Sequence, residues 1–337
     1  MSQSETRHPV RSLAAFAVQD VPVLAALLAA AGLKFVDVGG RGSAFGALLP
    51  LAPFADYYVS EPDAAEAERL QRQLPLDAPW RSVTVLSAAV GSRQGEARLH
   101  LTLKPGMSSL LEPDPEVTRR FFTEGVFRVV DAVTVPVVPL DTAASRYGFT
   151  DAAFLKLDTQ GTELEILRSG SRLVRESLLA VHTESLFQPF YKGQSLFADV
   201  DGYLRDNGFA LFSLNRTTLR RSGYRPSLYS KRVVTWAHCL YMREPETLLA
   251  AGPETLRRDL PRLLALALAF EHYDLSLEIV AIAGRVGLLP QSDLTQLAKD
   301  VERVATVGSE RMLRKARRQG LEDTVMAPNF SDRKQLQ

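Results

Sequence analysis

The chain has 337 residues, of which 46% are hydrophobic and 23% charged, a composition typical of globular proteins with a sizeable core. A formal net charge of +1 creates no overall field that would select an anionic or a cationic partner. The single cysteine, Cys239, excludes a disulfide within the chain and fits a reducing compartment. The length accommodates one large domain with an appendage, or two ordinary domains.

The apolar N-terminal stretch, residues 13–33, is interrupted by Gln19, Asp20 and Pro22. The remaining run from residue 21 to residue 33 is too short to span a bilayer, and it leads directly into the first predicted strand instead of a cleavage site. Residues 1–33 are therefore predicted to form a helical segment packed on the following domain, in a cytoplasmic protein without a membrane span.

Strand and helix patterns alternate over much of the chain. Strands are predicted at residues 34–38, 56–60, 82–86, 153–157 and 178–182, with helices at 64–73, 162–167 and 196–207. This alternation predicts a parallel sheet that is covered by helices on both faces. Two closing strands, 209–214 and 233–242, have only a loop between them, so the last strand should run in the reverse direction.

Two further segments depart from this alternation. Period-two patterns at 96–103 and 127–138 predict a small antiparallel β insertion. Beyond Pro245, apolar residues at helical spacing in 260–270, 275–286 and 294–304 predict a helical appendage over 245–325, with Ser292 or Asp293 capping its last helix. The polar residues 326–337 are predicted to be a disordered tail.

A glycine-rich loop follows the first predicted strand and reads Val36-Asp37-Val38-Gly39-Gly40-Arg41-Gly42. Glycines let the backbone approach a ligand closely, and a helix starting behind the loop would offer free N–H groups to a carboxylate or phosphate. Glu61 ends the second strand, where an acid can accept hydrogen bonds from both hydroxyls of a ribose. Together they predict a ribose-containing cofactor, either NAD or S-adenosylmethionine. A carboxylate at Asp37 is unfavourable beside a pyrophosphate but can bind a cationic aminoacyl group, which favours S-adenosylmethionine.

A third motif runs from Phe154 to Glu163 and reads FLKLDTQGTE. It predicts a buried strand that brings Asp158 to the carboxyl edge of the sheet, followed by a tight turn into a helix. Because ligands of open α/β sheets bind outside this edge, Asp158 is expected to face the cofactor. The alternative is that Asp158 only caps the helix.

The order of these motifs resembles the FkbM-type S-adenosylmethionine-dependent methyltransferases, which are O-methyltransferases of natural products and glycans. The resemblance covers about residues 34–242. Its motifs are Asp37-Val38-Gly39, Glu61-Pro62, Ala88-Ala89-Val90-Gly91, Gly106-Met107-Ser108-Ser109-Leu110, Val138-Pro139-Leu140-Asp141, Lys156 to Glu165 with Leu167, and Glu184. The chain departs from the family pattern where Arg41 replaces an Asn, Ser43 a Gly, and Gln160 the more common Glu.

The resemblance implies an α/β fold with a Rossmann-like methyltransferase sheet over residues 34–244, mostly parallel with its last strand reversed. It implies S-adenosylmethionine as cofactor and methylation of a hydroxyl on a sugar, glycan or natural product. The residues assigned to the cofactor are Asp37, Gly39, Gly40, Gly42, Glu61, Pro62, Ser87 and Ala88. Those assigned to the acceptor are Ser108, Ser109, Gln160, Tyr191 and Lys192, and no metal is expected.

Three residues at neighbouring strand ends are candidate general bases: Asp158, His182 and Glu184. His182 and Glu184 are two residues apart and face the same way on a strand, so the carboxylate should raise the pKa of the imidazole and orient it. The alternative is a hydrogen-bonded pair without a catalytic role. Positioning supplies about 7–11 kcal/mol and a base about 3–5 kcal/mol, so loss of a cofactor-loop residue should reduce the rate more than loss of a base.

Residues 215–232 contain basic side chains but no acidic one. Such a loop could bind a phosphate, a uronic acid or nucleic acid, or remain a solvated connection. A small-molecule or glycan acceptor is the expected partner and nucleic acid is not; association with glycan-assembly enzymes or further copies of the chain is compatible with the sequence. The alternatives are a non-catalytic S-adenosylmethionine-binding or scaffolding module, an NAD-dependent oxidoreductase and a nucleic-acid methyltransferase.

Overall fold

The computed structural model describes residues 17–121, 123–227 and 229–319. The first 16 residues and the predicted disordered tail, 326–337, lie outside the described residues. Among the described residues, no helix combines the length and the apolarity needed to cross a membrane.

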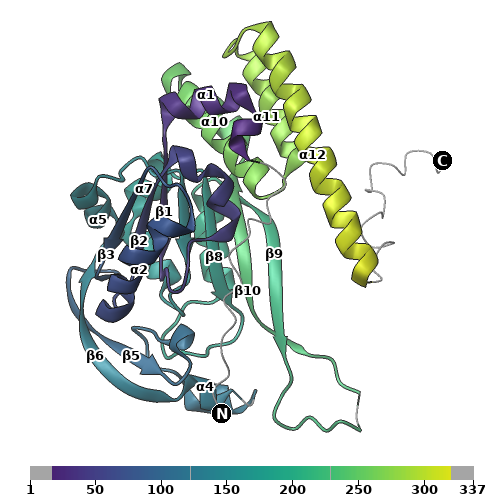
Figure 1. The fold of residues 1–337 in the computed structure, drawn as a ribbon. Coiled ribbons are helices and arrows are strands. Elements are labelled where there is room, and N and C mark those ends of the chain that lie inside the picture. Colours follow the sequence, from purple (N-terminus) through teal and green to yellow (C-terminus); the bar gives the residue numbers. More distant parts are fainter. Residues whose placement is uncertain (1–16, 122, 228, 320–337) are drawn as a thin grey trace.

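A seven-stranded sheet with the strand order β3-β2-β1-β7-β8-β10-β9 forms the centre of the molecule (Figure 1). Its strands are β1 (Leu33–Val38), β2 (Ala55–Ser60), β3 (Ser82–Leu86), β7 (Phe154–Leu157), β8 (Ala180–Leu186), β9 (Phe209–Leu219) and β10 (Val233–Arg243). Parallel pairing joins β3, β2, β1, β7 and β8, whereas β10 is antiparallel to both β8 and β9. The predicted parallel sheet with a reversed last strand is confirmed.

One face of the sheet is covered by short helices of the central region, as the alternation predicted. The helices between the strands are α2 (Ala64–Asp77), α5 (Leu140–Tyr147), α6 (Glu163–Ser169), α7 (Ser171–Glu176) and α8 (Phe197–Asp206). Apolar side chains of α5, α6, α7 and α8 form one buried cluster with Val36, Leu155 and Val181 of the strands. Asp63 fixes the start of α2, because its Oδ1 accepts hydrogen bonds from the amides of Ala65 and Glu66.

The α-helix expected directly behind the glycine-rich loop is absent. The segment that follows is instead a 3-10 helix, η2 (Gly46–Phe54). Pro50 and Pro53 lie inside it, and a proline ring removes the N–H that an α-helical hydrogen bond would need. The loop therefore has no α-helix N-terminus behind it that could receive an anion.

The β insertion forms a second sheet with the order β4-β6-β5. Its strands are β4 (Ala89–Val90), β5 (Gly95–Thr102) and β6 (Val129–Val138). The antiparallel pairing of β5 with β6 confirms the prediction, whereas β4, which pairs with β6 in parallel, was not predicted. Short helices, η3 (Pro105–Met107), α3 (Pro115–Arg119) and α4 (Glu124–Phe127), fill the connection from β5 to β6.

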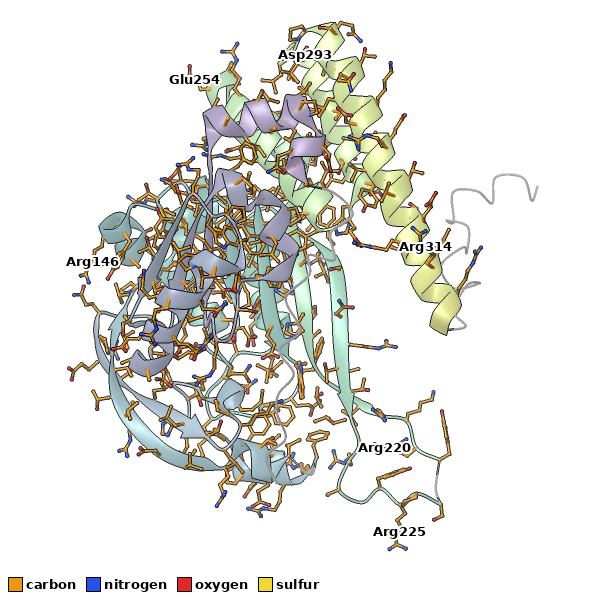
Figure 2. The ribbon with its side chains drawn as sticks, viewed as in Figure 1. Arg146, Arg220, Arg225, Glu254, Asp293 and Arg314 are labelled. Carbon is orange, nitrogen blue, oxygen red and sulfur yellow. The ribbon has the colours of Figure 1, made fainter. Side chains whose placement is uncertain are left out.

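Strand β9 continues five residues beyond its predicted end, to Leu219, and pairs with β10 almost throughout. The two strands and the loop between them extend well past the sheet as a projecting hairpin, which we call the arm and define as residues 215–232 (Figure 1). In Figure 2 the labelled side chains of Arg220 and Arg225 lie on this arm, away from the body of the protein.

The C-terminal helices stack with the N-terminal segment at the other end of the molecule (Figure 1). The elements there are η1 (Val18–Asp20), α1 (Pro22–Ala31), α9 (Pro245–Leu249), α10 (Pro253–Ala269), α11 (Tyr273–Arg285) and α12 (Gln291–Gln319). Helix α12 begins at Gln291, so Ser292 and Asp293 lie in its first turn. The prediction that one of them is the N-cap is therefore wrong.

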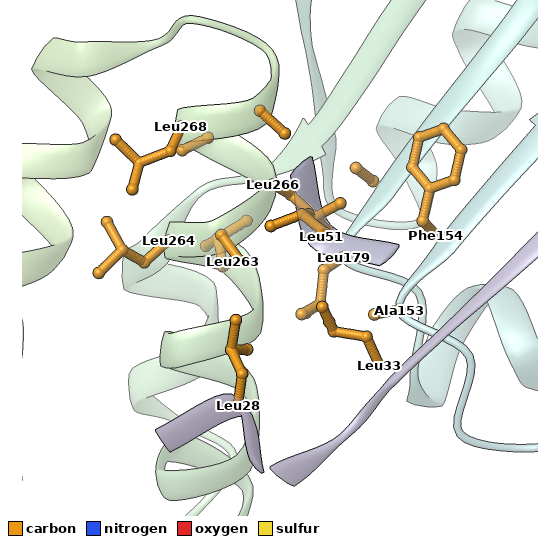
Figure 3. Close-up of a cluster of buried hydrophobic side chains, with 14 of the residues drawn as sticks. Leu28, Leu33, Leu51, Ala153, Phe154, Leu179, Leu263, Leu264, Leu266 and Leu268 are labelled. Carbon is orange, nitrogen blue, oxygen red and sulfur yellow. The ribbon is translucent and has the colours of Figure 1, made fainter. Parts of the chain in front are cut away.

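Helix α10 covers the second face of the sheet and shares its core. Leu263 and Leu266 of α10 belong to the same buried cluster as Leu51 of η2, Phe154 of β7 and Leu179 (Figure 3). The helices after residue 245 are therefore packed against the sheet through a continuous apolar contact, with the N-terminal helix α1 in the same cluster.

Candidate active site

A cavity of about 520 Å³ lies at the carboxyl ends of β1, β2 and β7. The sheet side of its lining includes Asp37, Gly39, Glu61, Pro62, Lys156, Asp158 and Gln160. The β insertion forms the opposite wall with Leu99, Pro105, Gly106, Ser108, Ser109 and Leu110. The prediction that Gly39, Glu61 and Asp158 share one cleft is confirmed.

The glycines at the end of β1 allow neighbouring segments to approach closely. A Cβ on Gly39, whose φ is +76°, would lie 2.1 Å from the carbonyl oxygen of Asp158. A Cβ on Gly40 would lie 2.3 Å from Cγ1 of Val59. Only glycine fits at these two positions, because any side chain would push the β1 loop away from its neighbours.

The amides of this loop are already engaged within the protein. Gly39 and Gly40 donate to the carbonyl of Ser60, at 3.0 and 3.4 Å, and Gly42 donates to the Glu66 carboxylate at 3.0 Å. The amides of Gly39, Gly40 and Gly42 are therefore not free to bind a ligand. Of the three predicted glycines, only Gly39 lines the cavity.

Glu61 is buried, with 4% of its surface exposed, and faces the cavity from the end of β2. Its Oε1 accepts a hydrogen bond from the amide of Asp63 at 2.9 Å, while Oε2 has no hydrogen-bond partner among the described residues. Burial raises the pKa of this carboxyl group. Ser87 and Ala88, also assigned to the cofactor, do not line the cavity; the Ala88 carbonyl accepts a hydrogen bond from Ser60 at 2.6 Å.

Asp37 is held from two sides beneath the cavity. Its Oδ1 accepts a hydrogen bond from Lys156 Nζ at 2.7 Å and its Oδ2 one from the Tyr57 hydroxyl at 2.7 Å. Burial lowers the pKa of Lys156, but the charges of Asp37 and Asp158 outweigh it and the net pKa is raised. The result is a charged pair at the cavity wall, in which Lys156 is a site residue that the sequence reasoning did not assign. Alternation along β7 could have identified it, because Lys156 lies two residues before Asp158 and on the same face.

Gln160 joins two carboxyl groups. Its Nε2 donates to Asp158 Oδ1 at 2.8 Å and also to Glu184, while its Oε1 accepts from the Tyr191 hydroxyl at 3.0 Å. Burial and the nearby Asp158 carboxylate raise the pKa of Glu184 well above its usual value. A protonated Glu184 avoids placing two buried negative charges side by side.

Asp158 does not cap the helix that follows it. Glu163 fulfils that role for the turn, because its carboxylate accepts hydrogen bonds from the amides of Thr159 and Gly161, both at 2.9 Å. Burial raises the pKa of Glu163 to about 7. The capping alternative for Asp158 is therefore wrong, and its carboxylate faces the cavity.

His182 lies two residues before Glu184 on β8, further from the carboxyl edge of the sheet, and it is the register partner of Lys156 on β7. It does not line the cavity but packs against the ring of Phe45, with 4.7 Å between centroids, and its buried Nδ1 has no partner among the described residues. Burial, helped by His238 and Lys156, lowers the pKa of His182 to about 3. The predicted rise in the pKa of His182 beside Glu184 is wrong, because burial, the largest cause, lowers that pKa instead.

The predicted acceptor residues divide into two groups. Ser108, Ser109 and Gln160 line the cavity, and Ser109 Oγ donates to the Gln160 carbonyl at 2.9 Å. Tyr191 lies behind Gln160, outside the cavity lining, and Lys192 forms a surface ion pair with Glu112 at 2.9 Å. The sequence could not show that Tyr191 and Lys192 lie outside the cavity, because the loop after β8 folds back over the turn that contains Gln160.

Distant structural similarities exist. A protein from Pyrococcus horikoshii proposed to be an RNA methyltransferase is 10% identical over 67% of this chain and 84% of its own, with a TM-score of 0.31. A proposed tRNA methyltransferase from Streptococcus pneumoniae is 10% identical over 83% and 97%, with a TM-score of 0.31. A SAM-dependent methyltransferase from Agrobacterium tumefaciens is 9% identical over 67% and 61%, with a TM-score of 0.32. Scores this low say nothing about substrate, and no curated protein matches the chain.

The sequence itself matches a known family. Residues 55–211 match the family described as the methyltransferase FkbM domain. The match begins after the glycine loop, where Arg41 and Ser43 depart from the family pattern. It includes the strand ends that carry Glu61, Asp158 and Glu184, and also the β insertion. Over residues 55–211, the chain is therefore similar to the methyltransferase FkbM domain.

Proposed function

We propose that the protein transfers a methyl group from S-adenosylmethionine to a hydroxyl of a sugar, glycan or natural product. The observation that supports this most directly is that Asp158 lies in the wall of the same cavity as Glu61. The cavity lining near Asp158 also contains the hydroxyl side chains of Ser108, Ser109 and Thr159. A carboxylate among neutral hydroxyl groups suits an acceptor that is itself rich in hydroxyls.

The cavity fits the cofactor in size and in chemistry. Its volume of about 520 Å³ lies within the range of about 300–1,000 Å³ usual for small-ligand sites. Glu61 would accept hydrogen bonds from the ribose hydroxyls through its open Oε2. The Asp37–Lys156 pair would hold the aminoacyl end, with Asp37 facing the ammonium group and Lys156 the carboxylate.

S-adenosylmethionine, when bound, supplies a methyl group that is electrophilic because it is attached to a positively charged sulfur. The acceptor hydroxyl would donate its hydrogen bond to Asp158, which Gln160 holds in place at 2.8 Å. Asp158 would take the hydroxyl proton as the bond from the methyl carbon to the acceptor oxygen forms and its bond to sulfur breaks, which leaves a neutral thioether. Glu184, which keeps its own proton, would limit the repulsion that Asp158 experiences.

Cofactor binding is tested by titration calorimetry with S-adenosylmethionine. Glu61→Ala removes the ribose acceptor and should weaken binding by about tenfold, which corresponds to about 1.4 kcal/mol. Glu68→Ala is the matched control, because Glu68 lies on α2, where its 75% exposed side chain has only a 4.0 Å contact with Arg72. The control should bind like the wild type. Absence of binding to the wild-type protein would refute the proposal.

Catalysis is tested with a panel of oligosaccharide and natural-product acceptors, followed by mass spectrometry. Asp158→Asn keeps the size of the side chain but removes the base, so turnover should fall by about 10²–10⁴-fold while affinity for S-adenosylmethionine stays within about twofold. Equal turnover in wild type and variant would show that Asp158 is not the base.

A non-catalytic, cofactor-binding module is the second candidate. It is favoured by the glycine-loop amides, which are engaged within the protein. It predicts tight binding of S-adenosylmethionine without methyl transfer to any acceptor of the panel. For either function we propose a cytoplasmic location, which agrees with the single buried cysteine, Cys239.

A further inference from the structure

The arm concentrates positive charge outside the cavity. Its six basic side chains are Arg216, Arg220, Arg221, Arg225, Lys231 and Arg232, and it contains no acidic residue. The remaining 34 Lys and Arg of the chain are outnumbered by 39 Asp and Glu, so the rest of the protein is net acidic. The near-neutral total therefore hides a strongly basic hairpin on an acidic body.

The arm has an internal structure, and one of its arginines also contacts the body: the Arg221 guanidinium group lies 5.8 Å from the ring centroid of Phe121. Arg220 lies over the ring of Tyr224, 3.9 Å from its centroid, and donates to the carbonyl of Ser230 at 3.1 Å. Arg216, Arg225 and Arg232 are exposed, and their side chains have no hydrogen bond or ion pair with any of the described residues. These three guanidinium groups are available to an external anion.

The arm emerges at the same edge of the sheet as the cavity. Strand β9 runs in the same direction as β8, because β10 is antiparallel to both, so its continuation leaves the carboxyl edge (Figure 1). Its loop contacts the β insertion, where the amide of Ser222 donates to the carbonyl of Arg120 at 2.7 Å.

The connection from β5 to β6 also contains the exposed cations Lys104 and Arg128. The carbonyl of Arg128 accepts a hydrogen bond from Leu103 at 2.9 Å, and Lys104 directly precedes Pro105, which lines the cavity. The insertion also contains acids, but most are engaged. Glu112 pairs with Lys192, Glu124 with Arg119, and Asp114 caps α3, whereas Glu96 and Glu116 have no ion pair with any described residue. Exposed cations therefore lie both on the arm and next to the cavity rim.

We propose that the arm binds the charged stretch of an acidic glycan and so holds the acceptor beside the cavity. This inference rests on the proposed function, because it describes the acceptor of that reaction. Carboxylate or phosphate groups along the glycan would pair with the exposed guanidinium groups of Arg216, Arg225 and Arg232. A hydroxyl further along the same glycan would then enter the cavity.

The arm is less suited to RNA. Proteins that bind single strands without sequence preference stack successive bases on aromatic side chains. Here one face of Tyr224 is covered by Arg220, and Tyr229, which is 93% exposed, is the other aromatic residue of the arm.

The test measures binding of oligogalacturonate, a carboxylate-bearing glycan, by calorimetry at low and at physiological salt. The triple variant R216Q/R225Q/R232Q should bind oligogalacturonate at least about tenfold more weakly, because three ion pairs are lost. Its affinity should also depend less on the salt concentration, since fewer charged contacts remain to be screened. The matched control R146Q/R257Q/R285Q removes three exposed arginines from distant helices and should bind like the wild type. Both triple variants should bind S-adenosylmethionine normally.

Three results would overturn the inference. Equal affinity of wild type and arm variant for oligogalacturonate would show that the arm is not the binding surface. Equal affinity of the wild type for neutral dextran would show that charge is irrelevant. Tighter binding of poly(U) than of oligogalacturonate would assign the arm to nucleic acid. If S-adenosylmethionine still binds in these cases, the proposed methyltransferase function is not refuted, and only the proposed glycan binding by the arm is.

Discussion

Gln160 adopts a left-handed backbone conformation, with φ at +61°, that a residue with a side chain rarely occupies. Such a conformation costs about 1–2 kcal/mol and persists only where surrounding contacts hold it. Here the Ser109 hydroxyl binds its carbonyl, and Tyr191 and two carboxyl groups bind its amide side chain. The same contacts that hold Gln160 in this conformation also hold the Asp158 carboxylate in position. The strained turn after β7 is therefore part of the site.

His182 should make the protein sensitive to acid. Its folded-state pKa of about 3 lies below the ordinary value of 6.5, so the unfolded chain takes up a proton first as the pH falls. This contribution to stability is present above pH 6.5 and is lost between pH 6.5 and 3. His182→Phe keeps an aromatic ring beside Phe45 but cannot be protonated, and it should lose less stability than the wild type over this interval.

Urea unfolding at a series of pH values from 7 to 4 measures the difference. Parallel curves for wild type and His182→Phe would show that His182 does not titrate in the way the structure implies. Because His182 does not line the cavity, affinity for S-adenosylmethionine should be unchanged in His182→Phe.

At the scale of elements, strand register decides which polar side chains meet. The β1–β7–β8 register aligns Asp37, Lys156 and His182 in one row across the sheet. Asp158 and Glu184 follow two residues later on the same face, nearer the carboxyl edge. Asp37 and Lys156 of the first row and Asp158 of the second line the cavity, whereas His182 and Glu184 of β8 lie outside its lining.

Arg262 links helix α10 to the end of α1. Its side chain is buried and donates to the carbonyls of Ala31 and Gly32, at 2.6 and 2.9 Å, and it lies 3.7 Å from buried Asp259. Its guanidinium group also donates to the carbonyl of Asp151 at 3.3 Å. Arg262→Met should lower the free energy of unfolding by about 3 kcal/mol, because three carbonyls lose a donor and buried Asp259 loses a neighbouring positive charge. The loss is at the lower end of the usual range, since Arg258 still pairs with Asp259.

Denaturant unfolding tests this prediction. Arg257→Gln, an exposed arginine on the same helix, should stay within about 0.5 kcal/mol of the wild type. A stability of Arg262→Met equal to that of the wild type would mean that the contacts between α10 and α1 contribute nothing.

At the scale of the whole molecule, we propose a methyltransferase domain over residues 34–244 and a helical appendage over 245–325 that folds as part of it. The apolar cluster of Leu263, Leu266, Leu51 and Phe154 crosses this boundary. A chain that ends at Glu244 would expose the second face of the sheet to water. It should bind a hydrophobic dye and lose its cooperative thermal transition.

A chain that ends at Gln319 is the control, because it keeps every described element. It should unfold in one transition at the wild-type temperature. A sharp transition and normal S-adenosylmethionine binding in the chain that ends at Glu244 would instead show that the helices are an independent unit.

The local sequence determined the elements and their order, because apolar periodicity and turn residues act over a few positions. Strand β3 begins and ends where predicted, at Ser82 and Leu86, and the loop between β9 and β10 correctly predicted a reversed last strand. The chemistry at the strand ends was also visible: Gly39, Glu61 and Asp158 follow their strands directly and meet in one cavity.

Tertiary structure decided the partners of these side chains. The lowered pKa of His182 and the pairing of Asp37 with Lys156 depend on strands that are far apart in the sequence. The engaged amides of Gly39 and Gly40 depend on the carbonyl of Ser60, which lies on another strand. Burial and register are properties of the packed sheet, so no pattern along the chain could reveal them.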